Sequence, residues 1–302
     1  MSFSQDVKQE IASHIPLSRH CRIAELSGLY FLCGESGVRE GVDSISFHTE
    51  NIEVARLCFT LLKKTFNITV NACVKRSKLL SYAVGVFGRD AENVKETLKI
   101  SEDINRSIKL LTEKDCCRRV FLSGVFLVSG SMNDPERSYH LEIVCEDEGR
   151  AELLREMICS FGIEARSAVR KKYHVIYVKE GDGIVDMLNI MDANRALLSM
   201  ENTRVLKDMR NRVNRSVNCE TANIKKTVGA AVRQINDIEF LMETGNFKEL
   251  DEGLKQIALL RLENKEATLT ELGEMLNPPV GKSGVNHRLR KISDIAGMIR
   301  GI

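Results

Sequence analysis

The side chains best suited to recognise another molecule gather near the C-terminus. Residues 285–296 place apolar side chains at helical spacing, and the face opposite that stripe is basic and polar near its start. Arg and Asn suit the edges of guanine and adenine in the major groove of DNA, and cations suit phosphates. A helical bundle with a solvated basic face is the alternative. The candidate contacts to DNA are Thr270, Lys282, Ser283, Asn286, His287, Arg288, Arg290 and Lys291.

Three short helices are expected to position these side chains. The first carries an apolar stripe. Thr268 and Glu271 form a capping box that opens the second helix, and two consecutive prolines stop it. Ser283 is expected to cap the third. This order, with polar and basic residues early in the last helix, is what a helix-turn-helix needs. The connection from 277 to 282 is longer than the usual turn of this motif.

Other chemistries find little support in the sequence. The segment 281–283 reads Gly-Lys-Ser, but a phosphate-binding loop also needs a glycine where Leu276 stands. The nine cysteines form no CxxC pair, and the adjacent Cys116 and Cys117 are not expected to chelate one metal. We interpret the cysteines as scattered buried thiols of a reducing cytoplasm. We expect no catalytic residue, no metal, no cofactor and no small-molecule substrate.

Two stretches elsewhere in the chain share an unusual pattern. Residues 26–34 and 122–130 both begin with Leu-Ser-Gly, continue with mainly apolar residues and end with Gly. Each stretch is too short to cross a bilayer. Gly inside a helix costs roughly 1 kcal/mol relative to Ala, so its use in both stretches indicates a close approach of two backbones. We therefore expect the two helices to pack on each other.

This pattern resembles the LAGLIDADG motif, in which two such helices form the spine between the pseudo-symmetric halves of a homing endonuclease. In those nucleases the last acidic residue of each motif holds a metal at the scissile phosphates. Here the corresponding positions are Cys33 and Ser129, whose thiol and hydroxyl do not replace a carboxylate pair. The resemblance implies a degenerate nuclease scaffold. The alternative is a metal-dependent DNA- or RNA-processing enzyme that uses Glu35 and Asp134 as displaced ligands.

The elements around the two stretches repeat in one order. After the first helix come a Gly-rich segment, predicted as a turn, a strand near 44–48, a helix and two strands. The second half follows the same order with a nearly constant offset, which indicates an internal duplication. The expected fold class is α+β: a pseudo-two-fold, LAGLIDADG-like αββαββα domain in two copies, followed by an all-α helix-turn-helix domain.

We expect three parts along the chain. Residues 1–190 form the duplicated domain, with halves near 20–100 and 112–190, residues 191–222 are a connector, and residues 223–302 form the helix-turn-helix domain. Basic residues occupy the same strand-to-strand turn in both halves, either at the rim of a shared saddle or as ordinary solvated turns. The connector is rich in Arg. Candidate secondary contacts to DNA are Lys75, Arg76, Lys78, Arg170, Lys171, Lys172, Arg212 and Arg215.

The composition is that of an ordinary globular protein, with 28% charged and 43% hydrophobic residues and a net charge of +2. Residues 195–302 carry slightly more Lys and Arg than Asp and Glu, and residues 1–194 show the reverse. This difference favours the C-terminal third as the part that binds anions. The N-terminus lacks a signal-peptide pattern, and we see no transmembrane candidate. We therefore expect a cytoplasmic protein that does not enter a membrane.

The two Leu-Ser-Gly helices, the segment 214–223 and the segment 283–291 together resemble the WhiA family over essentially the whole chain. These bacterial regulators are linked to sporulation, cell division and chromosome segregation. The resemblance implies a nucleoid-associated protein that binds double-stranded DNA sequence-specifically, regulates transcription and lacks nuclease activity. Protein partners in transcription or cell division are expected. A third interpretation treats the N-terminal domain purely as a docking surface for a protein or small ligand.

Overall fold

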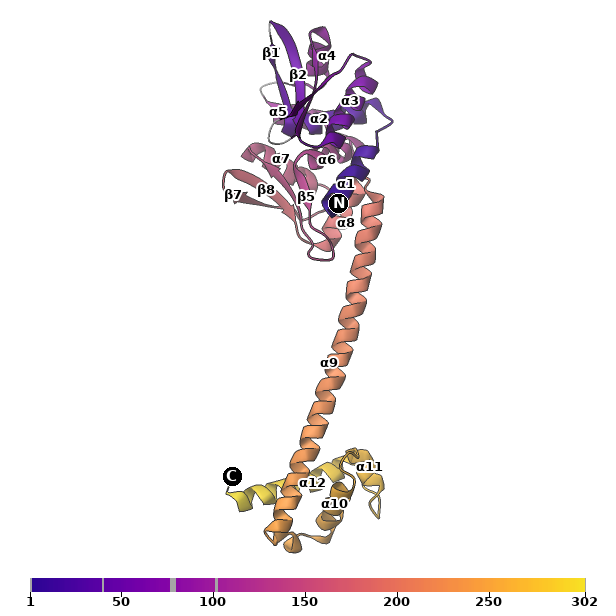
Figure 1. The fold of residues 1–302 in the computed structure, drawn as a ribbon, viewed down its shortest axis with the longest axis vertical. Coiled ribbons are helices and arrows are strands. Elements are labelled where there is room, and N and C mark those ends of the chain that lie inside the picture. The colour runs from indigo at the N-terminus through magenta and orange to yellow at the C-terminus, as the bar shows by residue number, and fades with distance from the viewer. Residues whose placement is uncertain (1, 40, 77–79, 101–102, 302) are drawn as a thin grey trace. The chain divides into compact units, whose positions relative to one another are not determined.

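The computed structural model separates into two compact units, Met1–Lys207 and Asp208–Ile302 (Figure 1). The point of division lies inside a single helix, α9, which runs from Asn194 to Glu243. The domain limits expected from the sequence remain a prediction. The structure describes residues 2–39, 41–76, 80–100 and 103–301.

The first unit contains the order helix, strand, strand, helix, strand, strand, helix twice, which confirms the expected αββαββα duplication. A short helix, α1 (Phe3–Ser13), precedes both copies, and α5 (Ile104–Leu111) lies between them. The first copy comprises α2 (Arg19–Cys33), β1 (Gly34–Arg39), β2 (Val42–Thr49), α3 (Ile52–Phe66), β3 (Asn71–Arg76), β4 (Leu80–Phe87) and α4 (Arg89–Thr97). The second comprises α6 (Asp115–Ser129), β5 (Gly130–Met132), β6 (Leu141–Cys145), α7 (Glu148–Cys159), β7 (Arg166–Arg170), β8 (Tyr173–Val178) and α8 (Gly181–Ile190).

Each copy builds one four-stranded antiparallel sheet. The strand orders are β1-β2-β4-β3 and β5-β6-β8-β7, so the topology is the same in both. The register is equivalent as well, because Gly34 pairs with Phe47 and Gly130 pairs with Ile143. The inner strand β6 alternates buried and half-buried side chains, as expected for a strand with one face on a core. The edge strands β3 and β7 are exposed along their whole length.

One detail of the first copy differs from the sequence prediction. The Gly-rich segment after α2 is a strand, β1, rather than a turn. Its backbone pairs with β2 along its whole length, and these ladder hydrogen bonds outweigh the low strand propensity of glycine at a sheet edge. Helix α1, which precedes this copy, is capped by Ser2, which shares a capping box with Gln5.

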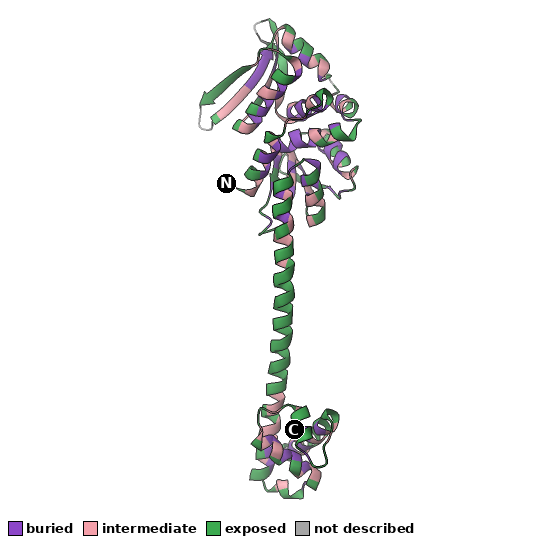
Figure 2. Cartoon of the chain, turned by 90° about the vertical axis from the view of Figure 1, so that its right-hand side faces the viewer, coloured by how far each residue is buried: buried purple, intermediate pink, exposed green. Residues whose placement is uncertain are grey.

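Helix α9 continues without a break through residues 214–223, which overlap the end of the expected connector. This segment contains neither Pro nor Gly, and Gly229 is the one glycine in α9, so no residue there stops a helix. Its low apolar content makes the helix solvated rather than irregular. Residues 208–228 are exposed, as Figure 2 shows for the middle of α9.

The second unit packs the end of α9 against three helices around a small apolar core. Thr268 caps α11 and Glu271 completes the capping box, as predicted. Ser283 does not cap α12, because the N-cap is Gly281 and Ser283 lies within the first turn. None of the helices in the described part of the chain is long and apolar enough to span a membrane. The unit's own helices are α10 (Glu252–Glu263), α11 (Leu269–Glu274) and α12 (Lys282–Arg300), with a 3-10 turn at Asn246–Glu249.

Candidate nucleic-acid interface

Helix α12, the candidate recognition helix, begins with backbone groups that can bind an anion. Its N-cap, Gly281, supplies no side-chain hydrogen bond, and its carbonyl accepts from the backbone N–H of Val285. The three N–H groups between these residues therefore lack a helical acceptor. Lys282 and Ser283 are exposed beside them. Helix N-termini favour phosphate. A lysine at this end is disfavoured by the helix dipole, and a bound phosphate offsets that cost.

The exposed face of α12 carries groups that can read base edges. Val285 and Leu289 are buried, which turns Asn286, His287 and Arg290 to solvent. Asn286 and Arg290 are four residues apart and are therefore neighbours on the helix surface. Within the described residues, neither side chain has a hydrogen-bond or ion-pair partner. An amide and a guanidinium without internal partners are available to the edges of adenine and guanine.

The other three predicted contacts of the second unit have different surroundings. Lys291 forms an ion pair with Asp251, with 3.3 Å between nitrogen and oxygen, so part of its charge is already balanced. Arg288 is half-buried, and its guanidinium carbon lies 3.7 Å from the place of a Cβ on Gly253. Thr270 is exposed in the first turn of α11. These three residues stay candidate contacts to DNA.

The long connection between α11 and α12 folds back on α11. The backbone N–H of Val280 donates to the carbonyl of Gly273 at 3.0 Å. A Cβ on Gly273 would lie 2.1 Å from the carbonyl oxygen of Val280, so only glycine permits this approach. The connection therefore reverses the chain direction as tightly as a short turn, although it contains more residues. It holds the start of α12 beside α11, which a helix-turn-helix requires.

The basic strand-to-strand turns of the first unit are also at its surface. Lys75 and Arg76 end β3 and are exposed, whereas Lys78 lies outside the described residues. Residues 170–172 are exposed in the equivalent turn of the second copy. There Arg170 lies 3.4 Å from Glu142, and the Lys172 ammonium lies 5.0 Å from the centre of the Tyr173 ring. Arg212 and Arg215 are exposed on α9. These residues stay candidate contacts to DNA.

The two Leu-Ser-Gly helices, α2 and α6, pack on each other as predicted. A Cβ on Gly28 would lie 2.3 Å from the carbonyl oxygen of Phe121 on α6. A Cβ on Gly124 would lie 2.7 Å from the carbonyl oxygen of Glu25 on α2. Both distances are too short for any side-chain carbon, and in both cases the obstacle is backbone. The glycines are therefore required by the contact between the helices.

The positions that hold metal in the nucleases carry neutral groups here. The Cys33 thiol donates to the carbonyl of Leu29 at 3.1 Å, and burial raises the pKa of this thiol to about 12. The Ser129 hydroxyl is buried and has no hydrogen-bond partner within the described residues. Magnesium and manganese prefer carboxylate oxygens, and neither side chain supplies one. The end of the helix pair therefore lacks the donor set of the nuclease centre.

The alternative acidic ligands do not replace that donor set. Glu35 lies 3.4 Å from His48. Asp134 accepts a hydrogen bond from the backbone N–H of Glu136 at 2.8 Å, which is local turn chemistry. Among the residues that the structure describes, neither acid belongs to a group of three or more side chains able to hold one metal.

Two features of the helix pair were not predicted from the sequence. Glu25 is 2% exposed, and burial raises the pKa of its carboxyl group to about 8.

The prediction of scattered buried thiols is wrong for three of the nine cysteines, because Cys73, Cys116 and Cys219 are exposed. Cys116 and Cys117 also converge with His20 and Cys21, although adjacent cysteines were not expected to serve one site. The duplicated helices themselves were the only sequence signal for this convergence.

A duplicated αββαββα scaffold joined to a small helical module with an exposed basic helix defines a class of proteins, the LAGLIDADG-like proteins that carry a helix-turn-helix. Three family models match the chain. They are the WhiA N-terminal LAGLIDADG-like domain over residues 19–87, the WhiA LAGLIDADG-like domain over 118–210 and the WhiA C-terminal HTH domain over 213–296. The chain belongs to the WhiA family.

Curated relatives and a solved structure agree with this assignment. The "Probable cell division protein WhiA" of Lachnoclostridium phytofermentans is 49% identical over 99% of this chain and 100% of its own length. The protein of the same name from Alkaliphilus oremlandii is 45% identical over 98% and 97%. The crystal structure of full-length DUF199/WhiA from Thermatoga maritima is 28% identical, with a TM-score of 0.62 and coverage of 99% of both chains.

Proposed function

We propose that this protein is a sequence-specific, double-stranded-DNA-binding regulator of transcription in which α12 enters the major groove. The observation that carries the proposal is the exposed pair Asn286 and Arg290, which lacks partners within the described residues and is held outward by the buried stripe of α12. The basic start of α12, which has no side-chain cap, then binds phosphate beside the groove. This contact fixes how deeply the helix enters the groove.

The proposed process follows from the relatives. The curated relatives are named as probable cell division proteins. We extend this role to the present chain, together with chromosome segregation and, in species that sporulate, sporulation. The protein acts at the nucleoid in the cytoplasm and meets protein partners of transcription or cell division. The basic turns of the first unit and the exposed Arg residues of α9 add phosphate contacts.

The proposal is tested on a genomic target obtained by crosslinking the protein to chromosomal fragments. Arg290→Ala and Asn286→Ala are each expected to lower the affinity for that target by about 1–3 kcal/mol in an anisotropy titration. Binding is expected to weaken steeply with salt, because phosphate contacts release counterions. Lys265→Ala is the matched control, since Lys265 is an exposed cation outside α11 and α12. Unchanged affinity in both α12 variants would show that α12 is not the recognition helix.

One double variant distinguishes the two roles considered for the first unit, which are docking of another molecule and phosphate contact with DNA. If it only docks another molecule, the double variant Lys75→Glu and Lys171→Glu leaves the affinity for DNA unchanged. If it contributes phosphate contacts, the same variant weakens binding and lowers the salt dependence by roughly two phosphate contacts. Both side chains are exposed, so the fold tolerates the change.

We further propose that the protein does not cut DNA, because Cys33 and Ser129 place no carboxylate at the end of the helix pair. The measurement is incubation of supercoiled plasmid with the protein and magnesium or manganese. We expect no nicked or linear product. Metal-dependent cutting that disappears in Glu35→Ala would instead establish displaced ligands and an enzyme.

A further inference from the structure

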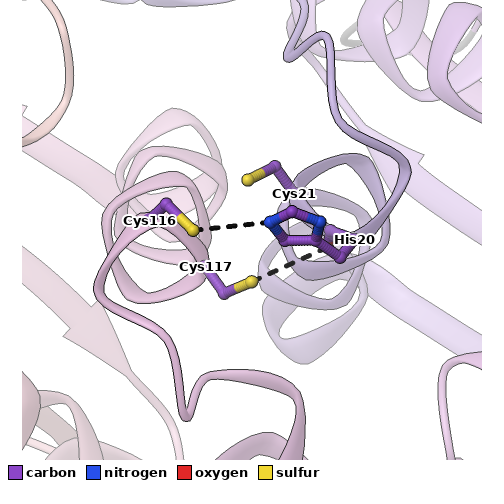
Figure 3. A group of neighbouring side chains, drawn as sticks. All are labelled: His20, Cys21, Cys116 and Cys117. Atoms are coloured by element: carbon purple, nitrogen blue, oxygen red, sulfur yellow. Dashed lines mark hydrogen bonds between the residues drawn. The ribbon is translucent and has the colours of Figure 1, made fainter.

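Four potential metal ligands converge at the N-terminal ends of α2 and α6 (Figure 3). The group, called here the thiol cluster, consists of His20, Cys21, Cys116 and Cys117. Their ligand atoms all lie within 4.8 Å of one another. The Cys116 sulfur lies 3.5 Å from His20 Nε2, and the Cys117 sulfur lies 3.9 Å from the carbonyl oxygen of His20. Two helices far apart in the sequence therefore direct four side chains at one small space.

The internal duplication explains how adjacent residues can serve one site. His20 and Cys21 are the second and third residues of α2, and Cys116 and Cys117 are the second and third residues of α6. The backbone contacts at Gly28 and Gly124 hold these two helices close together. Equivalent positions of the two copies therefore face each other across the pseudo-two-fold axis. Each helix supplies two ligands, so no CxxC spacing is needed.

We propose that the thiol cluster is a structural zinc site, with the sulfurs of Cys21, Cys116 and Cys117 and the imidazole Nε2 of His20 as ligands. Three sulfurs and one nitrogen form one of the usual ligand sets of structural zinc. Tetrahedral ligands at Zn–S distances of about 2.3 Å lie roughly 3.8 Å apart. The cluster therefore needs to contract by at most about 1 Å, which side-chain rotation supplies. Soft thiolates select zinc over magnesium or calcium.

The surroundings favour the bound form. Zinc replaces the protons of three thiols, so binding releases three protons to solvent and leaves a site of net charge −1 with neutral His20. The N-termini of α2 and α6 both point their positive dipole ends at this charge. Cys21 and Cys117 are only 7% and 3% exposed, whereas His20 and Cys116 are exposed. An ion can therefore enter from solvent and be held by buried ligands.

Four protein ligands leave no open position for a substrate, so the site joins the two halves rather than performing chemistry. It lies at the ends of α2 and α6 opposite to Cys33 and Ser129, the degenerate nuclease positions. The thiol cluster and the degenerate nuclease positions therefore lie at opposite ends of the same helix pair. The proposal does not depend on DNA binding by α12.

The test measures metal in the full-length protein after reduction, loading with zinc and gel filtration. We expect one zinc per chain in the wild type. Cys116→Ser and His20→Asn change exposed ligands, so both variants are expected to fold and to retain less than about a tenth as much zinc. Cys73→Ser and Cys219→Ser are the controls, because both residues are exposed cysteines outside the cluster. Both controls are expected to retain the full amount.

Cobalt(II) supplies a second readout that does not depend on the amount of metal retained. In the wild type it is expected to show thiolate-to-metal charge-transfer absorption and the intense visible bands of a tetrahedral site. Both signals are expected to be lost in Cys116→Ser and kept in the controls. Reduced wild-type protein that retains no zinc, or equal retention in Cys116→Ser, would overturn the proposal. A Cys21–Cys117 disulfide in metal-free protein alkylated at lysis would also overturn it.

Discussion

Helix α12 exposes polar side chains to solvent, whereas the helix pair α2–α6 buries or half-buries them. In the pair, Glu25 is buried, Cys33 and Ser129 are half-buried, and burial raises the pKa of the Glu25 carboxyl group and of the Cys33 thiol. On α12, Asn286 and Arg290 are exposed and available. Burial disfavours charge and removes access to a partner. The comparison supports the proposal that the pair is a scaffold and that α12 is the surface that binds DNA.

The two regions also differ in what their glycines bring into contact. In the pair, Gly28 and Gly124 bring the backbones of α2 and α6, two helices far apart in the sequence, into contact. In the second unit, Gly273 allows only a local contact, the return of one loop onto α11. A change in the pair should therefore unfold the first unit, whereas changes on α12 should alter binding and leave the fold intact.

The largest effect is expected for Gly28→Ala. The added Cβ meets the carbonyl oxygen of Phe121 at 2.3 Å, and a backbone atom cannot rotate away. Overpacking costs typically 1–3 kcal/mol, and we expect about 4 kcal/mol or more here because two helices must separate. Denaturant unfolding monitored by circular dichroism measures the loss. Gly37→Ala is the control, since no atom lies within 4 Å of the Cβ position there. Equal stability of both variants would refute the close contact.

A smaller but specific effect is expected from the buried Glu25. Its pKa is raised from 4.5 to about 8, so the folded state binds the proton more tightly than the unfolded state. The stabilisation is complete below pH 4.5 and is lost as the pH rises towards 8. We expect a decrease on the order of 2–4 kcal/mol across this window. Unfolding curves at several pH values should show this slope in the wild type and not in Glu25→Gln. Glu92→Gln, at an exposed position, should keep the slope.

On α12 the effects should appear in binding alone. Lys282→Ala is expected to lower affinity for DNA by about 1 kcal/mol and the salt slope by roughly one phosphate contact. The thermal midpoint is expected to stay the same or rise slightly, because the helix dipole disfavours a cation at this end. Titrations at several salt concentrations measure both quantities. A slope equal to that of the wild type would remove Lys282 from the interface.

The smallest effect is expected for Lys291→Ala. Its ion pair with Asp251 at 3.3 Å is exposed, and exposed pairs contribute little. We expect a change below about 0.5 kcal/mol in unfolding free energy, together with a smaller loss of affinity than in Arg290→Ala. A loss as large as that of Arg290→Ala would extend the recognition face to this edge of α12.

Local patterns explain how much could be predicted. Apolar periodicity predicted the helices α3, α7, α10 and α12, and the Leu-Ser-Gly repeats identified α2 and α6 as partners. The capping box at Thr268 was correct because it depends on residues three apart. Strand β1 was missed because its residues have low strand propensity and pair only through contact with β2. Ser283 was assigned as a cap because the preceding loop's return to Gly273 has no local signal.

The order of residues alone determined the duplication, the family and the loss of carboxylates at Cys33 and Ser129, because each depends on residue type at a fixed spacing. Tertiary structure alone decided that burial raises the pKa of Glu25 and that His20 meets Cys116. It also decided that Lys291 has an ion-pair partner, whereas Arg290 has none among the described residues. Burial and distance between remote residues set these properties. They arise only when α2 and α6, or α10 and α12, have packed together.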